Sequence, residues 1–279
     1  MNSTQTSSIN CKGYLVDLSQ PIVMGILNVT PDSFFDGGQL VTTATLLRQA
    51  EKMLTEGAAL LDIGGASSRP GAEEVNESEE MRRVLPAIEA VRTRFPEAIL
   101  SVDTWRAAVA KSALDAGAAI VNDISGGRWD AEMYAAVAER CCPYVLMHAQ
   151  GTPRTMQVAP VYEDVVQEVL DFFIAEVGRL RMLGVRDIVL DPGFGFGKTV
   201  EHNYALLKNL HVFSTVLGLP VLAGISRKSM ICQVLGVNPQ KALNGTTALH
   251  VVALQQGARI LRVHDVREAI EVVRLFEKF

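Results

Sequence analysis

The feature that most constrains the fold is a regular alternation of short apolar runs with helical segments along the chain. Eight runs are rich in β-branched and aliphatic residues and are expected to be strands: Ile22–Leu27, Leu60–Ile63, Ile99–Val102, Ile120–Val121, Tyr144–Met147, Ile188–Leu190, Val221–Ala223 and Ile260–Val263. Continuous apolar runs are typical of parallel strands that are covered on both faces. The repeated strand–helix order therefore predicts an α/β protein with a single TIM (β/α)8 barrel.

A polar or charged side chain follows each of these runs. The residues are Asn28, Arg69, Asp103, Asn122, His148, Asp191, Lys228 and Arg262. In a (β/α)8 barrel the loops after the strands meet at the C-terminal face, so we expect the active site there. An open doubly wound sheet is the alternative, but it would show one phosphate-binding turn at the first strand–helix junction.

The first two loops are rich in glycine and in charge. Met24–Gly38 (MGILNVTPDSFFDGG) passes from a strand into Asn28 and Asp36, and Gly64–Gly71 (GGASSRPG) contains Arg69. The first loop taken alone resembles an ordinary turn. Because the second loop also follows a strand, is rich in glycine and carries a cation, the two loops together favour a functional site.

The segment after Ala159 predicts a long outer helix. Its apolar residues recur at helical spacing: Val161, Val165, Val166, Val169, Leu170, Phe173, Val177 and Leu180. This spacing gives a helix one apolar face, which packs on the sheet.

Length and composition agree with one domain. The chain has 279 residues, of which 48% are hydrophobic, and α/β barrels reach this length as a single unit. We expect residues 1–20 to form an N-terminal segment that is flexible at its start. Residues 21–279 are expected to form the barrel.

Charge and cysteine content exclude several classes of protein. The net charge of -5, with scattered lysines and arginines, offers no basic surface for nucleic acid. No apolar run approaches the roughly 18 residues of a membrane span, so we expect a cytoplasmic protein without a membrane partner. The four cysteines form no C-x-x-C pair and are expected to be reduced.

The stretch Gly193–Thr199 (GFGFGKT) is similar to a nucleotide-binding loop but does not match one. Pro192 stands where the P-loop pattern requires its first glycine, and Lys198 stands where the dinucleotide pattern requires its last. We therefore expect neither ATP nor NAD. The loop would instead let its backbone and Phe196 approach a flat ligand.

Several motifs together resemble those of the dihydropteroate synthases of folate biosynthesis, a pterin-binding family. They are NVTPDSFFDGG, DIGGASSRPGA, SVDT, NDISGG, MHAQGTPRTMQ, DPGFGFGK, SRKS and RVHD. The resemblance extends from about residue 21 over almost the whole chain. It implies transfer of a pterinylmethyl group from its pyrophosphate ester to 4-aminobenzoate, Mg²⁺ as cofactor, a homodimer, and a target for sulfonamides.

The resemblance and the residue chemistry together assign a pterin site. A pterin ring presents N–H donors and a carbonyl acceptor, so its recognition needs carboxylates, an amide and a cation. The assigned residues are Asp103, Asn122, Asp191, Lys228 and Arg262. Each also has a structural alternative, because Asp103 could cap a helix beginning near Trp105, and Asn122 or Asp191 could end a strand.

The pyrophosphate group is assigned to Asn28, Arg69, Arg262 and His264. Arg262 and His264 follow the last strand, where barrels often bind phosphate. A lone histidine is more often structural, but Arg-x-His-Asp at a barrel rim favours an anion site. By resemblance Asn28 is also the metal ligand, since Mg²⁺ needs few protein oxygens when diphosphate and water supply the rest.

The catalytic assignments are Asp36, Arg69 and Lys228. Asp36 would stabilise positive charge on the pterin, and Arg69 would hold the departing phosphates. The 4-aminobenzoate pocket is assigned to Phe34, Ser68, Pro70, Phe196 and Ser226. Aromatic walls and hydroxyls suit a small flat acid.

Four positions depart from the family pattern, without removing an assigned charge: Phe35, Ala66, Ser68 and Ala149. Two other functions stay open, namely the pterin barrel of a folate-dependent methyltransferase and a non-catalytic pterin carrier. The apolar helix Thr246–Leu254 would suit the face of a homodimer.

Overall fold

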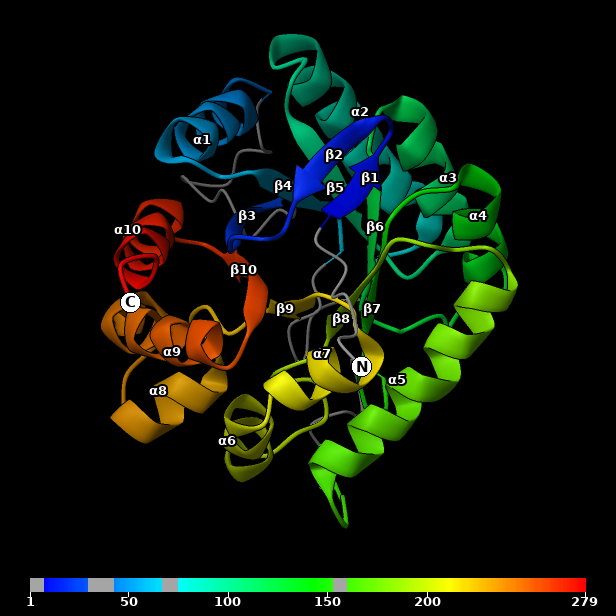
Figure 1. Ribbon diagram of the computed structural model, residues 1–279. Coiled ribbons are helices and arrows are strands. Elements are labelled where there is room, and N and C mark those ends of the chain that lie inside the picture. Colours follow the sequence, from blue (N-terminus) through cyan, green and yellow to red (C-terminus); the bar gives the residue numbers. More distant parts are fainter. Residues whose placement is uncertain (1–7, 30–42, 67–74, 153–159) are drawn as a thin grey trace.

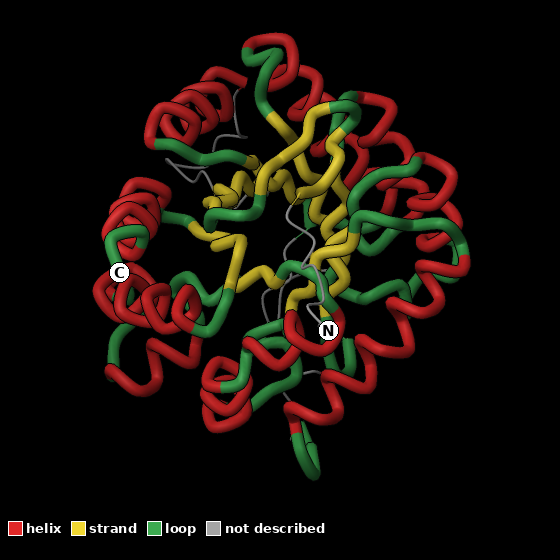
Figure 2. Tube along the Cα trace, viewed as in Figure 1, coloured by secondary structure: helices red, strands yellow, loops and turns green. Residues whose placement is uncertain are grey.

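The computed structural model describes residues 8–29, 43–66, 75–152 and 160–279. Parallel strands close into a barrel in the order β10-β3-β4-β5-β6-β7-β8-β9, surrounded by helices (Figures 1 and 2). The strands are β3 Ile22–Asn28, β4 Leu60–Gly64, β5 Ile99–Asp103, β6 Ile120–Asp123, β7 Tyr144–Met147, β8 Ile188–Asp191, β9 Val221–Ala223 and β10 Ala258–Val263. The predicted (β/α)8 barrel and its eight strands are confirmed.

Several strands extend beyond the apolar runs to include the polar residue that follows. Asn28, Asp103, Asn122 and Asp191 all lie within strands. Pairing between strands uses the backbone, so a polar side chain does not end it. These side chains are therefore carried on the rigid barrel rather than on loops.

The helices follow the strands around the outside. They are α1 Thr43–Glu56, α2 Glu77–Arg94, α3 Ala107–Ala116, α4 Met133–Arg140, α5 Val165–Met182, α6 Val200–Lys208, α7 His211–Leu217, α8 Ser229–Leu235, α9 Leu243–Gln255 and α10 Val266–Phe276, with a 3₁₀ turn at Pro239–Lys241. Within the described ranges, no helix combines the length and apolarity that a membrane crossing requires.

The long outer helix is confirmed as α5, but its predicted start is wrong at Val161. Asp164 is the N-cap, and its side chain accepts hydrogen bonds from the backbone N–H groups of Val166 and Gln167. Val161 precedes this cap and is 73% exposed. An aspartate that caps the first turn decides where a helix begins more strongly than one apolar residue upstream.

Alternation along the strands divides the side chains into an inner and an outer set. The outer set, including Leu61, Val102 and Leu190, belongs to the large apolar cluster that also includes helix residues such as Val84 and Phe173. The inner side chains near the strand starts are apolar and form a second cluster: Met24, Leu60, Ile120, Val145, Val189, Leu222 and Ile260. Several inner positions further along the strands are polar, among them Asp62, Asn122 and Asp191, and they build the site described below.

An N-terminal hairpin covers the barrel end opposite that site. Strands β1 Ser8–Cys11 and β2 Tyr14–Asp17 pair antiparallel and lie across the barrel opening (Figure 1). Ile9, Cys11 and Val16 belong to the inner apolar cluster. The predicted N-terminal segment, residues 1–20, thus contains a hairpin that no sequence pattern indicated, and residues 1–7 lie outside the described ranges.

Candidate active site

Strand register places four positions in one row at the C-terminal end of the barrel, namely Asn28, Gly64, Asp103 and Asn122. Asn28 pairs with Gly64, Gly64 with Asp103, and Asp103 with Asn122. A Cβ atom at Gly64 would lie 3.3 Å from Asn28 Oδ1 and 3.4 Å from Asp103 Cβ. A side chain at position 64 would crowd both groups, so glycine lets Asn28 and Asp103 lie this close to the strand between them.

Arg262 joins this row from the last strand. Its Nε donates to Asp62 Oδ2 at 2.6 Å, and one of its terminal nitrogens donates to Asp103 Oδ2 at 2.6 Å. Burial by itself lowers the pKa of Arg262, but the Asp62 and Asp103 carboxylates outweigh it and raise the pKa above its usual value. The guanidinium is thus a permanent cation, held between two acids.

For Asp103, burial outweighs the effect of the neighbouring cation. Burial raises the pKa of Asp103 to about 7, with Arg262 opposing the rise and Asp62 adding to it. The α3 helix does not use Asp103 as its cap, because the Ala107 N–H donates to Asp130 instead. Asp103 therefore points into the site, and it can carry or lose a proton near neutral pH.

Asp62 is a site residue that the sequence analysis missed. Its side chain is fully buried, and Oδ2 accepts both from Arg262 and from Asn122 Nδ2, the latter at 2.9 Å. Among the described residues, Oδ1 of Asp62 and Oδ1 of Asn122 have no hydrogen-bond partner. The available signal was an acid inside an apolar strand, two positions from Leu60 and so on the same inner face.

Asp191 and Lys228 place a second carboxylate and a second cation near Gly224. Asp191 Oδ2 and Lys228 Nζ each lie 3.8 Å from the place that a Cβ atom at Gly224 would occupy. Burial raises the pKa of Asp191 against the effect of Lys228, and burial lowers the pKa of Lys228 to about 8 against the effect of Asp191. Asp191 Oδ1 also accepts from the Gly193 N–H at 2.8 Å, so this carboxylate both ends its strand and faces the site.

An aromatic ring lies beside Lys228. Lys228 Nζ donates to the Phe194 carbonyl and lies 4.6 Å from the centre of the Phe196 ring. The ring packs on a small apolar cluster at the same end of the barrel: Ile124, Met147, Ala149, Trp105 and Trp129. The site thus has charged groups on one side and apolar side chains on another, as ligand sites for flat molecules do.

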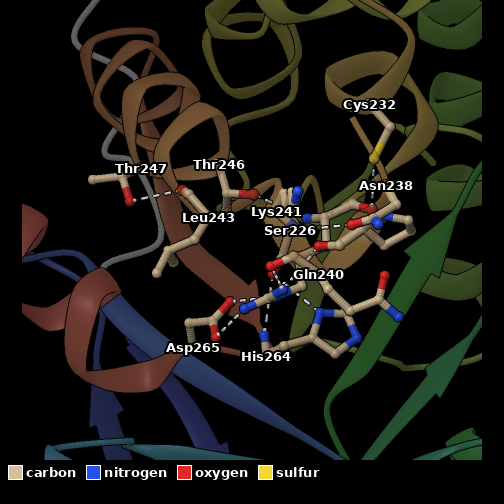
Figure 3. Close-up of polar contacts among 12 residues, drawn as sticks. Ser226, Cys232, Asn238, Gln240, Lys241, Leu243, Thr246, Thr247, His264 and Asp265 are labelled. Carbon is tan, nitrogen blue, oxygen red and sulfur yellow. Dashed lines mark hydrogen bonds and ion pairs between the residues drawn. The ribbon is translucent and has the colours of Figure 1, made fainter. Parts of the chain in front are cut away.

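Ser226 and His264, which were predicted for different substrates, are in contact. Ser226 Oγ lies 3.1 Å from His264 Nδ1 and accepts from the His264 backbone N–H at 3.2 Å (Figure 3). Arg227 between Ser226 and Lys228 has a φ of 57° and holds the Asp265 carboxylate with two hydrogen bonds of 2.7 Å. These bonds fix the loop after β9 against the loop after β10.

Two arginines hold the chain on each side of residues 67–74. Arg83 donates to the Gly65 carbonyl at 3.1 Å, and Arg106 donates to the Val75 carbonyl at 2.6 Å. Arg106 is in turn paired with the buried Glu80. The predicted residues Ser68, Arg69 and Pro70 lie outside the described residues, as do Phe34, Phe35 and Asp36.

Asn28, the predicted magnesium ligand, lies in the described part of the chain. There, no group of three or more His, Cys, Asp or Glu side chains is arranged to hold a metal. The Asn28 amide oxygen lies beside Gly64, which has no side chain to cover it. A single amide oxygen fits a hard ion that takes its other ligands from diphosphate and water.

A closed barrel with buried acids, an amide and cations at its C-terminal rim defines the class of protein. The family model described as "Pterin binding enzyme" matches residues 24–264, so the chain is a pterin-binding barrel. The dihydropteroate synthase of Escherichia coli (strain K12) is 48% identical over 268 residues, which cover 95% of this chain and 94% of that protein. The chain belongs to the dihydropteroate synthase family of transferases.

Solved structures agree with this assignment. The Yersinia pestis dihydropteroate synthase in complex with a sulfonamide drug has a TM-score of 0.92 and 46% identity, covering 97% of this chain and 98% of that one. The Xanthomonas albilineans dihydropteroate synthase with 4-aminobenzoic acid has a TM-score of 0.91 and 41% identity, covering 98% of this chain and 97% of that one. The predicted family is therefore confirmed.

Proposed function

We propose that this chain joins 6-hydroxymethyl-7,8-dihydropterin pyrophosphate to 4-aminobenzoate, giving 7,8-dihydropteroate and pyrophosphate, at the site described above. The observation that carries the proposal is the buried pair of open acceptors, Oδ1 of Asp62 and Oδ1 of Asn122, beside the cation of Arg262. Unpartnered buried oxygens are costly, so they indicate a ligand that brings N–H donors. A pterin edge carries such donors.

Pterin recognition follows from the fixed orientation of the Asn122 amide. Because Nδ2 donates to Asp62, Oδ1 is the atom presented to a ligand. Asp191 supplies a second acceptor, and Lys228 supplies a donor for the pterin carbonyl oxygen. Arg262 presents a flat guanidinium on which the ring can stack, and Asp103, with its pKa near 7, meets a ring nitrogen.

The reaction needs charge stabilisation more than covalent catalysis. The C–O bond between the pterin methylene carbon and pyrophosphate breaks, and its electron pair leaves with pyrophosphate. The amine nitrogen of 4-aminobenzoate forms the new C–N bond and then loses a proton. Asp36 would stabilise the positive charge on the pterin, and Arg69, Arg262 and His264 the negative charge on pyrophosphate.

Asn28 is the residue that would hold Mg²⁺ beside the pyrophosphate. The ion would add positive charge to the leaving group. Phe196 and Ser226, with Phe34, Ser68 and Pro70, would form the pocket for 4-aminobenzoate. Phe196 already lies against Lys228, next to the proposed pterin site.

Homodimer formation and a cytoplasmic location belong to the same proposal. The exposed apolar residues Val234, Leu235 and Val251 lie on α8 and α9, two helices in contact with each other, and would suit a two-fold interface. Val251→Glu should then give a monomer in sedimentation analysis. The cysteines are free thiols, which agrees with a reducing compartment.

One assay tests the proposed reaction against the two other functions. Purified chain is mixed with the pterin pyrophosphate, 4-aminobenzoate and Mg²⁺, and released pyrophosphate is measured together with 7,8-dihydropteroate. A methyltransferase barrel or a carrier would bind the pterin and release nothing. Equal amounts of both products, lost when either substrate is omitted, would support the synthase reaction.

A further inference from the structure

A buried lysine lies outside the set of residues assigned above. Lys198, between β8 and α6, is 4% exposed, and His148, which follows β7, is 6% exposed. Lys198 Nζ lies 3.0 Å from His148 Nδ1, 3.2 Å from the His148 carbonyl oxygen and 3.0 Å from the Phe196 carbonyl oxygen. Burial lowers the pKa of Lys198 well below its usual value, and the Asp191 carboxylate opposes this fall. In its ammonium form Lys198 has three N–H donors, which match these three acceptors.

The histidine is suited to accept rather than to donate at this position. Burial, together with the charge of Lys198, lowers the pKa of His148 well below its usual value. A neutral ring whose Nδ1 accepts from Lys198 carries its proton on Nε2. The ring is also held by an edge-on contact with Phe172, with 5.0 Å between ring centres.

Lys198 sits where the loops after β7 and β8 are in backbone contact. A Cβ atom at Gly193 would lie 1.9 Å from the His148 carbonyl oxygen, and one at Gly197 would lie 2.4 Å from the Gln150 carbonyl oxygen. Both glycines also have positive φ, 68° and 66°. Only glycine allows this approach, so the two loops form one packed unit.

The contact with Phe196 connects this unit to the proposed active site. Lys198 binds the carbonyl of the residue whose ring lies 4.6 Å from Lys228 Nζ. Phe196 lies between Gly195 and Gly197, both with positive φ, and its own N–H donates to the Gly193 carbonyl at 3.1 Å. The hydrogen bond from the buried Lys198 adds a restraint at the carbonyl group of Phe196.

We propose that Lys198 is a positioning residue of the synthase reaction: with His148 it fixes the backbone at Phe196, so that the ring keeps its place as the wall of the aromatic-amine pocket. The inference rests on the proposed function, because that function assigns Phe196 to 4-aminobenzoate. It predicts an effect on the second substrate more than on the pterin.

The first test compares Lys198→Met with Lys208→Met. Lys208 is exposed on the neighbouring helix α6, so its substitution controls for loss of a lysine. In Lys198→Met the KM for 4-aminobenzoate should rise about tenfold, because a displaced wall no longer orients the amine, while the KM for the pterin ester stays within about twofold. Unchanged KM for 4-aminobenzoate in a folded variant would overturn the proposal.

A double-mutant cycle with Phe196→Leu tests whether Lys198 acts through the ring. If it does, Lys198→Met should raise the KM for 4-aminobenzoate only slightly further in a protein that already carries Phe196→Leu. If the two substitutions multiplied their effects on the KM, Lys198 would act independently of the Phe196 ring, which would contradict the proposal. Inactive wild-type enzyme would defeat the proposed function itself, whereas active wild type with multiplying effects would defeat only the inference.

Variants of His148 provide a second route if Lys198→Met does not fold. His148→Asn retains an acceptor at the δ position, whereas His148→Leu removes it. We expect His148→Asn to restore most of the 4-aminobenzoate affinity that His148→Leu loses. Equal losses in both variants would show that the acceptor has no part in positioning Phe196.

Discussion

Oδ2 of Asp62 lies 2.6 Å from Nε of Arg262, although the two residues are 200 positions apart in the chain. The contact crosses the barrel seam, because Asp62 is on β4 and Arg262 is on β10, on either side of β3. The same oxygen orients the Asn122 amide. One buried acid therefore organises a cation and an acceptor of the proposed pterin site.

Asp62→Asn should weaken both pterin binding and the fold. Arg262, whose side chain is 18% exposed, loses a fully buried charged partner, which costs about 3 kcal/mol of unfolding free energy. The new amide also permits Asn122 to turn, so pterin affinity should fall at least about tenfold. Urea unfolding and calorimetry measure the two effects.

A matched control is available on the neighbouring strand. Ser101 pairs with Asp62 in register, is fully buried and has an unpartnered Oγ among the described residues. Asp62, and not Ser101, holds Arg262 and Asn122 in place, so Ser101→Ala should lower pterin affinity much less than Asp62→Asn does. If both variants lost affinity equally, the effect would come from general disturbance of the barrel.

Asp191→Asn separates binding from folding. The Asn oxygen can retain the hydrogen bond from Gly193, but its NH₂ group replaces the acceptor Oδ2 and faces the N–H donors of the pterin. The mismatch should cost about 2 kcal/mol, or about thirtyfold in Kd. Because burial raises the pKa of Asp191, loss of its charge should not lower the melting temperature. Near-normal pterin binding in a folded variant would defeat the assignment.

His264→Ala and Asn122→Ala should distinguish binding of the pyrophosphate group from binding of the pterin ring. His264→Ala should weaken the pyrophosphate ester much more than free hydroxymethylpterin, since only the ester carries the anion. Asn122→Ala should weaken both ligands. Calorimetry with each ligand makes the comparison, and identical losses for both ligands in both variants would remove the division into two subsites.

Asp103 should make stability depend on pH. Its pKa is about 7 in the folded protein against the ordinary value of 3.8, so the folded state binds the proton more tightly than the unfolded state. Its contribution to stability is complete below the ordinary value and is lost as the pH rises through about 7. The free energy of unfolding should therefore decline less steeply from pH 4 to pH 7 in Asp103→Asn. Parallel curves for variant and wild type would contradict the raised pKa.

Most of the fold could be predicted from local patterns. The apolar runs around Leu61 and Val189 appear in the sequence as they lie in the barrel, because strands covered on both faces are apolar at most positions. The hairpin at Ser8–Asp17 was missed. Its inward residues, such as Ile9 and Val16, are few, and they become buried only because the barrel offers an apolar end to cover.

The sequence by itself determined the order of the strands, the family, and the residue types that gather at the rim. These properties depend on near neighbours in the chain, where apolar periodicity and motif spacing can be read directly. Only the tertiary structure decided that Asp62 serves both Arg262 and Asn122, and that Lys198 reaches His148 and Phe196. Those contacts depend on how a closed barrel staggers its strands and on how closely two glycine loops approach, and both are set by packing across the whole chain.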